Sequence, residues 1–123
     1  ARYSLGTTAT LESPTKKYFL VAIARMSCEL MAQSTVDGFW QALSGLWCEV
    51  RLRGNLKPLA MPILGSALAR VGEPRMMLVK LIIMSFVAAT HRVKIADRLT
   101  IVIHPKDIED VDLYELKEFL QTI

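Results

Sequence analysis

The chain has few of the features that mark a specialised class of protein. Only two of its 123 residues are cysteines, Cys28 and Cys48, and they form no CxxC motif and have no histidine nearby. That spacing argues against a zinc site and suits a reducing compartment, although spacing alone leaves a disulfide open. No internal repeat, low-complexity segment or linker is visible, so we expect a single domain over residues 1–123.

Basic clusters, a leader sequence and a membrane span are also missing. Lys and Arg outnumber Asp and Glu by 15 to 12, and no basic run alternates with aromatic residues, so nucleic-acid binding is not expected. The first residues have no apolar stretch typical of a signal peptide, and we expect a cytoplasmic domain. The longest apolar run, 76–89, contains Lys80 and falls short of the roughly 20 residues of a transmembrane helix, so it predicts a buried helix.

The apolar residues, 52% of the chain, are spaced as alternating strands and helices. A strand in 1–11, a turn at 12–15 and a strand at 18–24 predict a hairpin, followed by a loop over 25–33. A helix is predicted from an N-cap at Ser34 to Arg53, with Trp40 and Trp47 in the core and Gly54 as a left-handed stop. The remaining predicted elements are a strand at 59–64, a helix at 74–90, a strand at 99–103, a loop at 104–107 and a helix at 111–121.

This order, β-β-α-β-α-β-α, predicts the α/β class, with parallel pairing in a three-layer α/β/α sandwich. In such sheets ligands bind beyond the carboxyl ends of the strands. Three loops are expected at that edge, after Ala24, after Leu64 and after Ile103.

The loop after Leu64 is the candidate ligand site. Gly65, Ser66 and Ala67 are three small residues between a predicted buried strand and a helix that starts near Pro74. Small side chains allow backbone N–H groups to approach an anion, and a nearby helix N-terminus adds a favourable potential. The pattern therefore favours a phosphate or pyrophosphate loop, although a plain tight turn has the same composition.

Several stretches resemble a known family. Residues 62–69, Pro-Ile-Leu-Gly-Ser-Ala-Leu-Ala, resemble the second phosphate-binding loop of macro domains. Taken with 3–9, 17–24, 99–103 and 112–116, they are most similar to the divergent macro-like domain of bacterial Thoeris anti-phage effector proteins. The resemblance keeps its order over nearly the whole chain and implies a mixed sheet. It also implies that the chain is the carboxyl-terminal two-thirds of such a domain, lacking the first strand and the first ligand loop.

The resemblance implies a module that senses ADP-ribose or an ADP-ribose derivative, with the diphosphate on residues 65–69. It implies a nucleotide signal made from NAD by a partner TIR-domain enzyme, and in some members a membrane segment outside this chain that would tether the domain to the inner membrane. It is compatible with a homo-oligomer. The residues expected to bind the ligand are Gly65, Ser66, Ala67, Leu68, Ala69, Arg70, His104, Ala24 and Met26.

An ADP-ribosyl hydrolase on the same scaffold is the alternative, and a structural domain without a ligand is a third interpretation. We predict no catalytic residue, because no Ser-His-Asp arrangement is evident and neither cysteine has a neighbouring base. We also predict no metal or cofactor. The acidic residues from 107 to 112 lack a histidine in a metal-like pattern, and they are interpreted as loop and helix-start charges.

Overall fold

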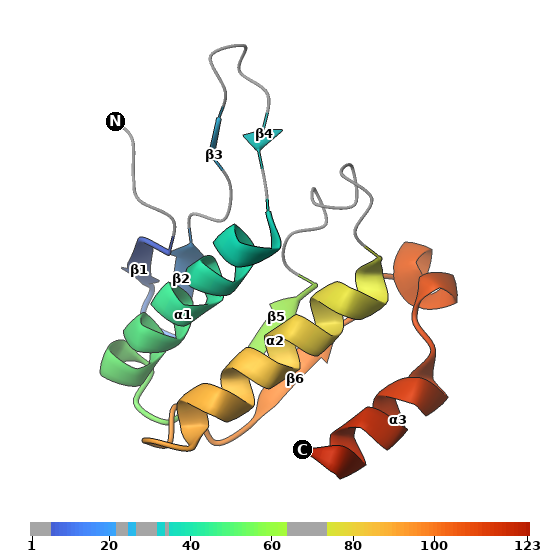
Figure 1. Cartoon of the computed structure of the whole chain (residues 1–123). Helices are drawn as coiled ribbons and strands as arrows, with labels where there is room; N and C mark the ends of the chain where they lie inside the picture. Colours follow the sequence, from blue (N-terminus) through green and yellow to red (C-terminus); the bar gives the residue numbers. More distant parts are fainter. Residues whose placement is uncertain (1–5, 22–24, 27–31, 34, 64–73) are drawn as a thin grey trace.

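A computed structural model of the chain describes residues 6–21, 25–26, 32–33, 35–63 and 74–123. Within these ranges, helices and strands alternate as predicted, which confirms the α/β class (Figure 1). Helices α1 and α2 lie side by side over the strands, and α3 lies beyond α2 on the far side from α1. The pairing is mixed, since one strand pair is antiparallel and another is parallel.

The predicted hairpin is confirmed. Strands β1 (Thr8–Glu12) and β2 (Lys17–Val21) pair antiparallel, from Thr8 opposite Val21 to Glu12 opposite Lys17. A loop was predicted over 25–33. That prediction is wrong at 25–26 and 32–33, and residues 27–31 lie outside the described part of the chain. Two short strands, β3 (Arg25–Met26) and β4 (Ala32–Gln33), pair antiparallel. Strands of two residues are too short to leave a period-two pattern in a sequence.

The predicted parallel pairing is found between β5 (Leu59–Pro62) and β6 (Leu99–Val102). Their register runs from Leu59 opposite Leu99 to Pro62 opposite Val102, so both strands end at the same edge. Pro62 is the last residue of β5, a position where a missing N–H disturbs little of the ladder.

Helix α1 (Val36–Arg53) ends at Arg53 as predicted, but its N-cap residue and the conformation of Gly54 differ from prediction. Thr35, not Ser34, is the N-cap, and its hydroxyl accepts a hydrogen bond from the Gly38 N–H at 2.9 Å. Gly54 is right-handed, with φ of −83°, because its N–H continues the helix by donating to the Val50 carbonyl. The chain turns left-handed one residue later, at Asn55 and Leu56.

Helix α2 (Arg75–Thr90) begins directly after Pro74, as predicted, and is apolar on most sides. Helix α3 (Leu113–Thr122) is capped by Asp112, whose carboxylate accepts from two backbone N–H groups of the first turn. Between β6 and α3 the predicted loop is instead a 3₁₀ helix, η2 (Pro105–Asp110). Its start is favoured by Pro105, whose fixed φ suits a first helical turn.

The core lies between α1, α2 and the inner faces of the strands. Trp47 is buried, and its ring meets Phe86 edge to face with centroids 5.1 Å apart. Trp40, predicted in the same core, is instead 37% exposed. Among the described residues, no helix combines the length and apolar character needed to cross a membrane, and the run from 76 to 89 forms the buried helix α2.

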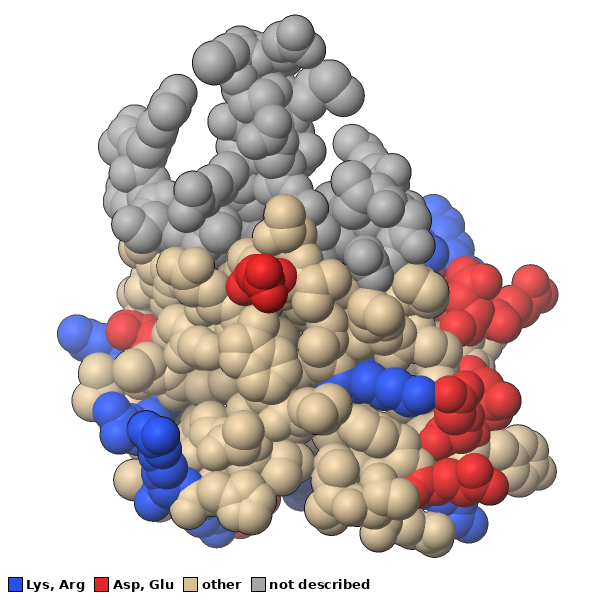
Figure 2. Space-filling model, in the orientation of Figure 1, with Lys and Arg blue, Asp and Glu red and all other residues tan. Residues whose placement is uncertain are grey.

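Charged side chains are unevenly distributed over the surface. Acidic side chains gather on the flank formed by η2 and α3, and basic side chains gather at the opposite lower side of the same view (Figure 2). The flank carries Asp107, Glu109, Asp110, Asp112, Glu115 and Glu118.

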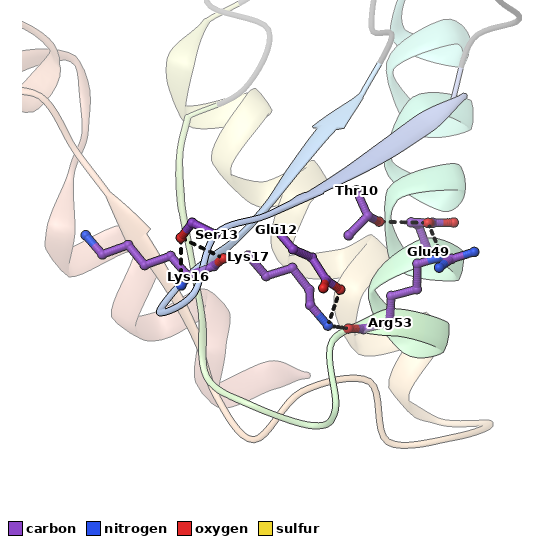
Figure 3. A network of polar contacts seen from close by, with 7 residues as sticks. All are labelled: Thr10, Glu12, Ser13, Lys16, Lys17, Glu49 and Arg53. Atoms are coloured by element: carbon purple, nitrogen blue, oxygen red, sulfur yellow. Dashed lines mark hydrogen bonds and ion pairs between the residues drawn. The ribbon is translucent and has the colours of Figure 1, made fainter.

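A polar network joins the hairpin to the end of α1 (Figure 3). Thr10 donates to Glu49 at 2.8 Å, and Glu49 pairs with Arg53 one helical turn later, also at 2.8 Å. Lys17 pairs with Glu12 at 3.3 Å and donates to the Arg53 carbonyl at 2.5 Å. These contacts hold the hairpin against α1 and place a lysine at the negative end of that helix.

Candidate functional site

The candidate site lies at the edge where β5 and β6 end. After β5 the chain passes the buried Ile63, enters residues 64–73, and returns at Pro74 to begin α2. Beside it, β6 ends at Val102 and the chain continues through His104 into η2. The topology therefore brings the starts of α2 and η2 to the same edge of the strand pair, as the sequence predicted.

Most of the predicted ligand residues lie outside the described part of the chain. These are Gly65, Ser66, Ala67, Leu68, Ala69 and Arg70 of the proposed loop, and Ala24, which follows β2 in the sequence. Met26 belongs to β3, which pairs with β4. Their roles in binding stay predictions.

His104 is the predicted ligand residue whose side chain is described. It is exposed and precedes η2, and its Nδ1 accepts a hydrogen bond from the Lys106 N–H at 3.0 Å. A neutral imidazole that accepts at Nδ1 carries its proton on Nε2, which leaves an N–H donor on the other side of the ring. His104 thus has a capping role that the sequence analysis did not foresee, together with a donor suited to a ribose hydroxyl or a phosphate oxygen.

An ion pair that the sequence analysis missed links the two segments at this edge. Arg75 is the first residue of α2, and its Nε lies against the carboxylate of Asp107 in η2. Its Nη1 lies 3.7 Å from Asp110. Both Arg75 and Asp107 are largely buried, at 28% and 17% exposure, so the pair is shielded from solvent. From the sequence, Asp107 and Asp110 were interpreted only as loop and helix-start charges.

The start of α2 has the electrostatic character of an anion site. Pro74 provides no side-chain cap, and the first turn contains no acidic residue, whereas α1 has Asp37 and α3 has Glu115 in that position. The unpaired N–H groups of a helix start carry partial positive charge. Asp107 and Asp110 both face Arg75 and offset its charge, so an anion at this edge would have to be bound chiefly by main-chain amides.

The side chains that could bind a metal ion are dispersed in the part of the chain that the structure describes. That part of the chain contains no group of three or more His, Cys, Asp or Glu side chains placed to hold a metal ion. Cys48 is a free, exposed thiol on α1, and Cys28 lies outside the described residues. The interpretation of Asp112 as a helix-start charge is confirmed by its cap on α3.

The fold defines an α/β domain in which chain connections follow the carboxyl ends of two parallel strands at one edge. A family model described as "Thoeris protein ThsA, Macro domain" matches residues 1–104, so the chain belongs to that macro-domain family. It is also similar to Thoeris protein ThsA of Bacillus amyloliquefaciens (strain Y2), with 27% identity over 121 residues. That alignment covers 96% of this chain and 39% of the relative, so the chain spans about two fifths of that protein's length. The resemblance stated from the sequence is confirmed: this is a macro domain of the Thoeris anti-phage defence type.

Proposed function

We propose that this domain senses an ADP-ribose-derived nucleotide and holds its diphosphate on residues 65–69. The observation that carries the proposal is the parallel register of β5 and β6, which ends with Pro62 opposite Val102. Residues 64–73, which include the Gly-Ser-Ala sequence, connect that edge to the start of α2. The carboxyl ends of parallel strands are the usual ligand-binding location in α/β folds. Membership of the macro-domain family supports the same location.

The electrostatics of the edge favour a diphosphate over a neutral ligand. Helix α2 is 16 residues long, and its first turn is free of acidic side chains. A helix start of this kind attracts anions through its N–H groups, and small loop residues let a phosphate approach the backbone closely. His104, one residue beyond Ile103, adds a donor from the neighbouring strand end.

Calorimetry on the full-length protein tests this proposal, with ADP-ribose as the probe and adenosine as a ligand without phosphate. We expect ADP-ribose to bind and adenosine to bind at least tenfold more weakly. Gly65→Glu should abolish binding, because the new carboxylate would repel the diphosphate. Thr15→Glu adds the same charge at an exposed turn of the hairpin and should leave affinity unchanged. Failure of the wild-type protein to bind any ADP-ribose-class ligand would refute the proposal.

In this account the nucleotide is a signal and the domain is not an enzyme. A TIR-domain enzyme would make the signal from NAD in the cytoplasm, and binding would change an activity elsewhere in the full-length protein. The ADP-ribosyl hydrolase alternative makes an opposite prediction, since it requires turnover. Chromatography after incubation separates the two, because a sensor returns its ligand intact and a hydrolase releases ADP-ribose from an ADP-ribosylated substrate.

A further inference from the structure

A hollow of about 360 Å³ lies between α1 and α2, at the end of α2 that is distant from the proposed nucleotide loop. Its wall includes the indoles of Trp40 and Trp47 and the side chain of Val93, and Arg51 and Arg92 also line it. Arg92 follows the end of α2, whereas residues 64–73 precede its start. The two sites are therefore separated by the length of a 16-residue helix, roughly 24 Å at 1.5 Å per residue.

The hollow is basic and partly apolar. No Asp or Glu is among its lining residues. Within the described part of the chain, Arg53 is paired with Glu49, but neither Arg51 nor Arg92 forms an ion pair. A suitable occupant would bring a carboxylate for the guanidinium groups and an aromatic or aliphatic group for the indole-lined wall.

The acidic flank of the same molecule presents both groups. Tyr114, near the start of α3, is 85% exposed, an unusual state for a large aromatic side chain. Glu118 follows it by four residues, so the phenol ring and the carboxylate lie on the same face of the helix. The neighbouring Leu113 is 58% exposed and widens the apolar part of this surface. Glu118 forms no ion pair with any other described residue.

We infer that copies of this chain associate head to tail, with α3 of one copy docked in the hollow of the next. The Tyr114 ring enters between Trp40 and Val93, and the Glu118 carboxylate pairs with Arg51 and Arg92. The uneven distribution of charge in Figure 2 supports this pairing, since acidic side chains outnumber the lysines on the η2–α3 flank, which are Lys106 and Lys117, and basic side chains gather at the opposite lower side. A helix in an apolar groove is a common recognition mode, and Tyr, Trp and Arg dominate binding energies at interfaces.

The two surfaces consist of different residues, so the contact is heterologous and leaves one free end on each terminal copy. Association therefore produces open chains or closed rings. It involves neither residues 64–73 nor His104. This inference is thus independent of nucleotide binding, and Gly65→Glu should leave self-association unchanged.

Sedimentation velocity on the chain tests the inference. We expect the mean mass to rise with concentration at about 50 mM salt and to fall back toward the monomer at about 500 mM, because screening weakens the charge pairs. Tyr114→Ala removes the inserted ring, and the double variant Arg51→Glu/Arg92→Glu reverses the charge of the hollow. For each variant, self-association should be at least tenfold weaker than that of the wild type. Tyr114→Phe keeps the ring and should still associate.

Mixing the two defective variants gives the sharpest test. The Tyr114→Ala protein keeps an intact hollow, and the double Arg variant keeps an intact α3 surface, so an equimolar mixture should form dimers and nothing larger. All the changed side chains are exposed, and unchanged melting temperatures would show that each variant is folded. A wild type that stays monomeric, or a mixture that does not associate, overturns the inference. A third outcome also overturns it: the wild type and Tyr114→Ala both bind anionic lipid vesicles, and neither self-associates. The basic side would then face a membrane.

Discussion

Gly6 and Gly45 meet backbone to backbone where the segment before β1 crosses α1. A Cβ placed on Gly45 would collide with the carbonyl and Cα atoms of Gly6. Gly6 itself has a φ of +87°, a left-handed conformation that other residues adopt at a cost. The close approach of the segment that contains Gly6 thus explains why α1 has a glycine at position 45, in the middle of the helix.

Gly45→Ala should therefore destabilise the domain although alanine is the better helix former. The helix gains about 1 kcal/mol in propensity, and overpacking against Gly6 costs about 1–3 kcal/mol. We expect a net loss of up to about 2 kcal/mol in the free energy of unfolding, measured by urea denaturation, because the colliding atoms of Gly6 are backbone atoms. Ser44→Ala, at the exposed neighbouring position, serves as the control and should change stability by less than about 0.5 kcal/mol. A more stable Gly45→Ala protein would contradict the close contact.

Ser85→Ala tests a buried hydrogen bond between the two long helices. The Trp47 indole Nε1 donates to the Ser85 hydroxyl at 2.9 Å, and that hydroxyl donates to the Ile82 carbonyl. Alanine would leave the buried indole N–H without an acceptor, a loss of about 1–3 kcal/mol. Thermal unfolding of Ser85→Ala, Trp47→Phe and the double variant measures the coupling. Additive effects would show that the bond contributes nothing.

The Arg75–Asp107 ion pair should matter more than an exposed one. Removing one partner of a buried pair leaves an uncompensated charge, and this pair is only partly exposed, so we expect Arg75→Met to cost about 1–3 kcal/mol. Arg53→Met breaks the more exposed pair with Glu49 and should cost less than about 1 kcal/mol. Equal losses in chemical denaturation would mean that shielding at the site edge has no effect.

Substitutions at His104 separate its capping role from ligand binding. His104→Ala removes the acceptor for the Lys106 N–H and should lower stability by about 0.5–1 kcal/mol. His104→Asn offers a replacement acceptor and should retain most of that stability. If the His104 Nε2 also donates to the nucleotide, both variants should bind ADP-ribose several-fold more weakly in calorimetry. If His104→Asn binds ADP-ribose with full affinity, the histidine caps η2 and does not bind the nucleotide.

The main elements could be predicted because their patterns are long and periodic. The apolar spacing of α1, the turn between β1 and β2, and the β-branched run of β6 each specify one structure locally. The parallel pair followed from the alternation of strands and helices, and both of its strands end at the edge where the candidate site was predicted.

Other features depend on contacts that no local pattern records. The end of α1 at Arg53 was predicted correctly, but the left-handed turn was assigned to Gly54, whereas Asn55 and Leu56 adopt it. Trp40 and Trp47 share a helical spacing, yet α2 buries only Trp47 fully, since Trp40 lies beside the hollow between the helices. The Arg75–Asp107 pair joins segments that are distant in the chain, and only the folded topology brings them together.

Lys80, the one charged residue of α2 after its first residue Arg75, has a consequence for the rotation of that helix. A helix that is apolar on every side has no preferred rotation about its axis when it packs in a core, and α2 is close to that case. Lys80 reaches Glu115 at 2.6 Å and lies 5.6 Å from the Phe119 ring, both on α3, while Ser85 faces Trp47 on α1. Five residues at 3.6 per turn put these two polar anchors roughly 140° apart around the axis. These two contacts together fix the rotation of α2 about its axis, because any rotation would break the Lys80–Glu115 ion pair or the Trp47–Ser85 hydrogen bond.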